Sequence, residues 1–156
     1  MNDKIMYLMT FIGKETVDIE LLNDFIDALS TNKDCDIPLD RYDINWILKG
    51  SKRAEIIAAQ NQGVFVAFNT MQEVLHSLSD RERELSGAII HFRTNPEFPF
   101  MEISSAMEVF QQSFADISEV IFGTTTNKDL PLDFVRITII CTGIEKTKML
   151  AANNVY

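Results

Sequence analysis

The segment from Phe134 to Thr142 limits the possible folds more than any other, because apolar residues recur in it at every second position. A repeat of two is the period of a β-strand, whose side chains point alternately to the two faces of a sheet. One face would carry Val135, Ile137, Ile139 and Cys141, and the other Arg136, Thr138, Ile140 and Thr142. This alternation predicts a sheet that helices cover mainly on one face.

Further strands and helices are predicted from the rest of the chain. The apolar runs 64–68, 87–92 and 120–125 have the composition of strands. Apolar residues at helical spacing predict helices over 18–30, 43–62, 70–78 and 101–114. Thr70 and Glu73 have the spacing of a capping box at the start of the third of these helices. The order of elements predicts an α+β fold of two layers, a four-stranded mixed sheet with helices packed on it.

Length and composition restrict the class of protein. With 156 residues, 46% of them hydrophobic, the chain can bury one substantial core. Its net charge of −9, without a cluster of basic residues, gives nucleic acids and anionic membranes no electrostatic attraction. Cys35 and Cys141 are far apart, which indicates a reducing compartment. The apolar run 5–12 fits a strand or a helical turn and is too short for a signal peptide or a membrane span, so we expect a cytoplasmic protein.

The usual motifs of catalysis and cofactor binding are absent from the sequence. The six glycines occur singly, so no glycine-rich loop is present that could bind a nucleotide phosphate, and we expect no cofactor. His76 and His91 have no Cys or carboxylate at metal-ligand spacing, so we expect both to be structural and no metal to bind. No nucleophile-elbow motif is present either. The sequence therefore predicts no catalytic residues.

Two aromatic features are candidates for contact with a partner. Phe98 and Phe100 flank Pro99 on a connection between elements. They either anchor this connection in the core or form an apolar docking patch. Trp46 lies three residues into a predicted helix, where we expect it to belong to the core.

Four segments together resemble the C-terminal domain of the FtsZ family, the bacterial tubulin-like cell-division GTPases. They are Gly87-Ala-Ile-Ile-His-Phe-Arg93, Phe98-Pro-Phe-Met-Glu-Ile-Ser104, Glu119-Val-Ile-Phe-Gly-Thr124 and Val135-Arg-Ile-Thr-Ile-Ile-Cys-Thr-Gly143. The resemblance covers about residues 63–144, in the family's order and spacing. It implies an FtsZ C-terminal-like domain over 37–144, an N-terminal extension of strand and helix over 1–36 and a short polar tail over 145–156. It also implies that the family's GTP-binding domain and membrane-recruiting tail peptide are absent from this sequence.

The segment Ile37-Pro-Leu-Asp-Arg-Tyr-Asp-Ile44 resembles the family's synergy loop, which reads Asn, any residue, Asp, two residues, Asp. In the family this loop enters the GTP pocket of the neighbouring subunit, where its carboxylates orient the attacking water. The resemblance therefore implies an interaction role for Asp40 and Asp43. Their spacing to the strand predicted at 64–68 is longer than in the family and implies an insertion or a helix extension. Both residues could instead simply cap the helix that follows, since Asp is a favoured N-cap residue.

Three hypotheses of function follow. In the first, the chain is a non-catalytic interaction domain that binds FtsZ, another tubulin-like GTPase or itself, and modulates filament assembly. In the second, it is a small-molecule-binding or enzymatic domain on a chorismate-mutase-like α+β sheet, with Arg93 or Arg136 in a buried pocket. In the third, it is one part of a split or degenerate GTPase whose nucleotide domain is encoded separately.

Overall fold

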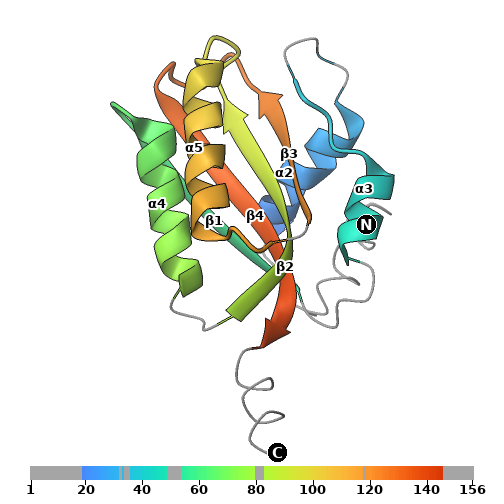
Figure 1. The fold of residues 1–156 in the computed structure, drawn as a ribbon. Helices are drawn as coiled ribbons and strands as arrows, with labels where there is room; N and C mark the ends of the chain where they lie inside the picture. The colour runs from blue at the N-terminus through green and yellow to red at the C-terminus, as the bar shows by residue number, and fades with distance from the viewer. Residues whose placement is uncertain are drawn as a thin grey trace, which may run out of the picture.

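The computed structural model describes residues 19–31, 33, 36–48, 54–79, 83–117 and 119–145. Figure 1 shows a sheet with helices on both sides. The helices are α2 (Ile19–Ser30), α3 (Arg41–Leu48), α4 (Val66–Ser79) and α5 (Phe100–Ser113), and the strands are β1 (Ala54–Gln62), β2 (Arg83–Thr94), β3 (Glu119–Thr126) and β4 (Phe134–Glu145). The strand order is β1-β4-β2-β3. Strand β4 is antiparallel to β1 and β2, whereas β2 is parallel to β3, which confirms the predicted four-stranded mixed sheet.

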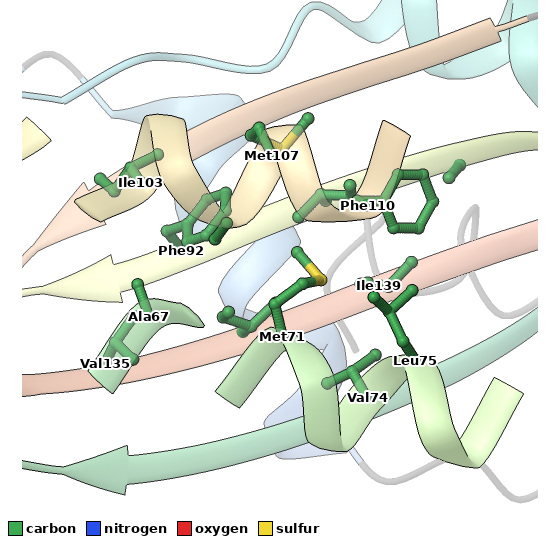
Figure 2. Close-up of a cluster of buried hydrophobic side chains, with 14 of the residues drawn as sticks. Ala67, Met71, Val74, Leu75, Phe92, Ile103, Met107, Phe110, Val135 and Ile139 are labelled. Atoms are coloured by element: carbon green, nitrogen blue, oxygen red, sulfur yellow. The ribbon is translucent and has the colours of Figure 1, made fainter. Parts of the chain in front are cut away.

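One face of the sheet packs against α4 and α5. Figure 2 shows the side chains of this core between the two helices and the strands. Phe92, Met71 and Phe110 are fully buried here. Strand β4 contributes Val135, Ile137, Ile139 and Cys141, the four residues that the alternation assigns to one face. The period of two in this strand therefore identified the larger core correctly.

The opposite face is also covered, by α2 and α3, so the prediction that helices pack mainly on one face was wrong. Phe25, Ile44 and Leu48 form a second buried cluster on this side together with Ile89 of β2 and Ile140 of β4. The polar neighbours of Ile140 suggested a solvated face. Thr138 is nevertheless fully buried. Its hydroxyl donates a hydrogen bond to Asp24 of α2, and a buried hydroxyl is tolerated when it has such a partner.

Strand β1 and the start of α4 were predicted wrongly. Residues 54–62 were expected to continue a helix from Asp43, but α3 ends at Leu48 and 54–62 pair with β4 along their whole length. Consecutive Ile56 and Ile57 pack on opposite faces of the sheet, which suits a strand. The strand after the synergy-like segment therefore begins at Ala54 and not at Val64 as predicted. Sheet pairing here outweighs the helix propensity of the local sequence, which is rich in Ala.

The run 64–68 was expected to be a strand, but it forms a turn followed by the first residues of α4. Gly63 has a φ of 134° and Phe65 a φ of 52°, so the chain reverses direction between β1 and α4. From Val66 onward the buried residues follow a helical repeat: Val66, Ala67, Met71, Val74, Leu75 and Leu78. Thr70 therefore lies inside α4 and not at its cap, and its hydroxyl donates to the Val66 carbonyl oxygen at 2.6 Å.

The other predicted elements are confirmed. Helices α2 and α5 differ from the predicted ranges by one residue at most at each end, and strands β2, β3 and β4 contain the runs that predicted them. No helix in the described ranges is long and apolar enough to cross a bilayer. The apolar run 5–12, Cys35 and the polar tail from residue 146 lie outside the described residues.

Gly123 of β3 allows the segment before α3 to approach the sheet. A Cβ atom at position 123 would lie 2.6 Å from Cγ of Leu39 and 2.9 Å from the Ile37 carbonyl oxygen. We expect Gly123→Ala to lower the free energy of unfolding by about 2 kcal/mol, because the buried Leu39 side chain must move away. Urea denaturation of the two proteins would measure this loss, and an unchanged midpoint would contradict the close approach.

Candidate interaction surface

The synergy-like segment is attached to the outer edge of β3. The Ile37 amide donates to Oγ1 of Thr124 at 2.8 Å, and the Thr124 amide donates to the Ile37 carbonyl oxygen at the same distance. Leu39 is buried next to Gly123. These contacts fix the chain immediately before Asp40 and so determine where α3 begins.

Asp40 is the N-terminal cap of α3. One of its carboxylate oxygens accepts the Tyr42 amide at 2.7 Å, and its carbonyl oxygen accepts the Ile44 amide at 3.1 Å. Asp43 lies in the first turn of the helix, where a negative charge is favourable. Both Asp side chains are exposed. Capping by Asp40 is thus compatible with a second role at the surface.

We expect Asp40→Ala to lower the free energy of unfolding by about 1 kcal/mol, because the Tyr42 amide loses its acceptor. Asp43→Ala should cost about 0.5 kcal/mol through the helix dipole alone. Chemical denaturation at low salt would compare the two variants. Equal losses would argue against the cap as the main stabilising role of Asp40.

Connections between strands and helices meet at one end of the domain, the upper end in Figure 1. The Gly63 amide, after β1, donates to the Asp133 carbonyl oxygen, just before β4, at 3.1 Å. Nδ2 of Asn95, after β2, donates to the Leu130 carbonyl oxygen at 2.8 Å. The starts of α4 and α5 are linked where the Ala67 amide donates to Oε1 of Glu102 at 3.4 Å. These bonds bring distant parts of the sequence to one surface.

Large apolar side chains are exposed on these connections and on the helix starts beside them. We call this set the apolar end surface: Val64, Phe65, Phe68, Phe100, Met101 and Leu132. Their exposed fractions range from 41% for Phe68 to 80% for Met101. Exposed apolar side chains that gather in this way are typical of protein–protein contact sites, and aromatic residues dominate the binding energy of such sites.

The structure separates the two aromatic residues that were predicted as one docking patch. Phe100 is 56% exposed, whereas Phe98 is 7% exposed and belongs to the core beneath α4 and α5. Sequence reasoning missed the other members of the apolar end surface because Val64 and Phe65 were read as part of a buried strand. The signal that could have found them is Gly63, which favours a turn at that point.

Phe65 combines exposure with an unfavourable backbone conformation. Its φ of 52° lies in the left-handed region, which is uncommon for bulky residues and costs about 1–2 kcal/mol. Its side chain is 73% exposed and so gains little from burial. A strained and exposed aromatic residue is of the kind that clusters at functional sites.

Two exposed aromatic residues lie elsewhere, on α3. Trp46 is 63% exposed and Tyr42 is 84% exposed. The prediction that Trp46 belongs to the core was wrong, because Ile44, Ile47 and Leu48 occupy the inner face of this short helix. The Trp46 indole N–H donates to Oε1 of Glu119 at 3.2 Å.

The arginines proposed for a ligand pocket are instead bound by carboxylates of the chain. Nε of Arg93 lies 3.0 Å from one Asp24 carboxylate oxygen, and Nε of Arg136 lies 3.0 Å from the other. Arg93 also pairs with Asp27. A shallow polar cavity of about 280 Å³ lies beside this cluster, lined by Asp27, Thr31, Lys33, Asp36, Arg93, Thr125 and Thr126. Most of these side chains already have partners within the chain, so few of them are left for a ligand: Asp36 accepts from Thr31 and Thr126, Lys33 donates to the Thr126 carbonyl oxygen, and Thr125 hydrogen-bonds His91.

His91 is fully buried beneath α2. Its Nε2 lies 2.9 Å from Oγ1 of Thr125, and its ring packs against Phe25. Burial, and then the positive charges of Arg93 and Arg136, lower the pKa of His91 to about 3. The ring is therefore neutral at pH 7, and its buried Nδ1 has no hydrogen-bond partner among the described residues. His76 is exposed on α4, and in the part of the chain that the structure describes no three His, Cys, Asp or Glu side chains are grouped to hold a metal.

Comparison with known proteins agrees with this architecture. Residues 53–145 match the model of the FtsZ family, C-terminal domain. The cell division protein FtsZ of two Helicobacter pylori strains is 28% identical over 154 residues, which cover 93% of this chain and 40% of the relative. The chain thus spans less than half the length of these curated relatives.

Solved structures of tubulin-like proteins share the fold. An FtsZ dimer from M. jannaschii aligns with a TM-score of 0.65 at 17% identity over 89% of this chain and 43% of that one. CetZ from Methanosaeta thermophila aligns with a TM-score of 0.60 at 15% identity over 85% and 37%. Since the family model covers more than half of the sequence, the chain belongs to the FtsZ family, whose C-terminal domain it contains.

Proposed function

We propose that this chain is a non-catalytic interaction domain that binds a tubulin-like GTPase filament through the apolar end surface and so modulates its assembly. The observation that carries the proposal is the gathering of six exposed large apolar side chains at one end of an FtsZ-type domain. Water contact with so much apolar surface is unfavourable, and a partner that covers it would remove that cost.

Two further observations support this function. One similar structure is an FtsZ dimer, and another is a CetZ2 protofilament from Haloferax volcanii, so domains of this fold occur in assemblies of tubulin-like proteins. In addition, Asp40 and Asp43 present exposed carboxylates on a segment that resembles the synergy loop. We propose that these carboxylates approach the nucleotide site of the bound GTPase subunit, where they would orient water.

The kind of partner follows from the charge. With a net charge of −9, the chain would be repelled by nucleic acids and by anionic lipid surfaces. We therefore propose a protein partner in the cytoplasm, an FtsZ or another tubulin-like GTPase. The proposed function requires no cofactor, and the chain's only contribution to GTP hydrolysis would be the carboxylates of Asp40 and Asp43 at the partner's nucleotide site.

The test is GTP turnover and filament sedimentation by the FtsZ of the same organism while the purified protein is added. We expect a dose-dependent change in both, and no turnover by this protein alone. Phe100→Ser combined with Met101→Ser should weaken the effect at least about tenfold, because these exposed residues would supply the docking contact. Both positions are more than half exposed, so the variant should keep its fold.

Trp46→Ser is the matched control, since it removes an exposed aromatic residue from α3, away from the apolar end surface. Because Trp46 lies on the same helix as Asp43, the readout for this control is sedimentation, and it should leave sedimentation of the complex intact. Asp40→Ala with Asp43→Ala tests the carboxylates separately, and we expect turnover to change while sedimentation of the complex persists. A protein that alters neither turnover nor sedimentation at any ratio would contradict the proposed function.

A further inference from the structure

We infer that two copies of this chain associate through the outer edge of β1, forming a two-fold symmetric dimer with one continuous sheet of eight strands. This inference does not rest on the proposed function, because it uses the outer edge of β1 and none of the six residues of the apolar end surface. It concerns the backbone of Ile56–Gln62 and the side chains on either side of it.

The outer edge of β1 is open for pairing. Among the strands that the structure describes, β1 is the last of the sheet and pairs with β4 alone. Among the described residues, no other segment forms backbone hydrogen bonds with residues 56–62. Every second residue of this stretch therefore points an N–H and a C=O group outward, and such an edge can accept a further strand.

The usual features that prevent edge pairing are missing from this stretch. Natural edge strands are protected by charged residues, prolines, bulges or covering segments. The sequence Ile-Ile-Ala-Ala-Gln-Asn-Gln, residues 56–62, contains no charge and no proline. The pairing of β1 with β4 runs without a bulge over all nine residues of the strand.

Apolar side chains flank the edge on both faces and are incompletely covered. Ile57 and Ala59 pack partly buried against the core beneath α4, and Ile56 packs partly buried against the cluster beneath α2. A strand added at the edge would cover these side chains further. The edge thus offers apolar contact together with backbone hydrogen bonds, as in other cases of strand addition.

The occupant that fits this edge is a second copy of the chain. Two copies that each carry a net charge of −9 repel one another over most of their surfaces, whereas residues 56–62 are neutral. A two-fold axis requires an antiparallel arrangement in which each position pairs with its mirror position. The register that pairs all nine residues of β1 places Ala58 opposite Ala58 of the second copy, Ile57 opposite Ala59 and the buried Glu55 opposite Asn61. No like charges therefore face each other in this register.

The experiment uses charge pairs at the axis. Light scattering after gel filtration should give the full-length protein a mass of twice 17.8 kDa at high concentration. Ala58→Lys and Ala58→Glu should each give monomers, because two like charges would then face each other across the axis. An equimolar mixture of the two variants should recover the dimer, since opposite charges meet there. Ala58→Thr, a neutral residue with high strand propensity, is the matched control and should remain dimeric.

Recovery on mixing also demonstrates that both variants are folded. A wild-type protein that remains monomeric at about millimolar concentration would overturn the inference. So would a dimer that persists in both charged variants, because the contact would then lie elsewhere. Folded monomeric variants that fail to associate on mixing would overturn the two-fold register. The filament assay can succeed or fail independently of each of these results.

Discussion

Lowering the pH from 7 to 4 is expected to remove about 3 kcal/mol of stability through His91 alone. In the unfolded chain this histidine binds a proton below its ordinary pKa of 6.5, whereas in the folded protein its pKa is lowered to about 3. Between these two values the unfolded state binds more protons. The stabilisation is therefore complete above pH 6.5 and is lost progressively as the pH falls toward 3. The slope approaches about 1.4 kcal/mol per pH unit inside this window.

The measurement is a series of urea denaturations between pH 7 and pH 4 on wild type and on His91→Gln. Glutamine does not titrate, and its amide can still hydrogen-bond Thr125. The carboxylates of the protein contribute equally to both series. The difference between the two proteins in the slope of the free energy of unfolding against pH therefore isolates the contribution of His91. Equal pH dependence of the free energy of unfolding in the two proteins would show that His91 has the same pKa in the folded and unfolded states, and would contradict the effect of its burial.

Replacing Asp24 by Asn is expected to lower the free energy of unfolding by about 3 kcal/mol. The Asp24 side chain is 5% exposed, and its two oxygens face Arg93 and Arg136, which are 22% and 19% exposed. Removing the negative charge leaves Arg136 without its ionic partner and leaves Arg93 with only the exposed Asp27. Partial exposure of the arginines to water moderates the loss, and for this reason we expect the lower end of the range for broken buried ion pairs.

Asp27→Asn is the control for Asp24→Asn. Asp27 also pairs with Arg93 but is 54% exposed, so its removal should cost less than about 1 kcal/mol. Thermal and urea unfolding of the two variants at neutral pH would compare them. Similar losses in both would mean that burial does not strengthen the contact between Asp24 and the sheet. A smaller loss for Asp24→Asn than for Asp27→Asn would contradict the expected order.

The candidate surface could be predicted from the sequence only in part. The position of Asp40 and Asp43 at the start of a helix was evident from their spacing, because capping depends on neighbouring residues. Exposure was harder to predict. Phe98 and Phe100 are two residues apart and equally apolar, yet only Phe100 faces water. Whether a residue on a connection is buried depends on which helices pack above it, and short-range sequence patterns do not contain that information.

The sequence by itself determined the elements whose periodicity was strong, namely α2, α5 and the alternating strand β4, together with membership of the FtsZ family. The tertiary structure decided the rest. Residues 54–62 became a strand because β4 pairs with them, although their local propensity favours a helix. Thr138 became buried because α2 covers its face of the sheet, where Asp24, 114 positions earlier in the chain, accepts its hydrogen bond. The periodicity of a short segment predicts to which face of its helix or strand a side chain points. Contacts between distant segments decide whether that face is covered.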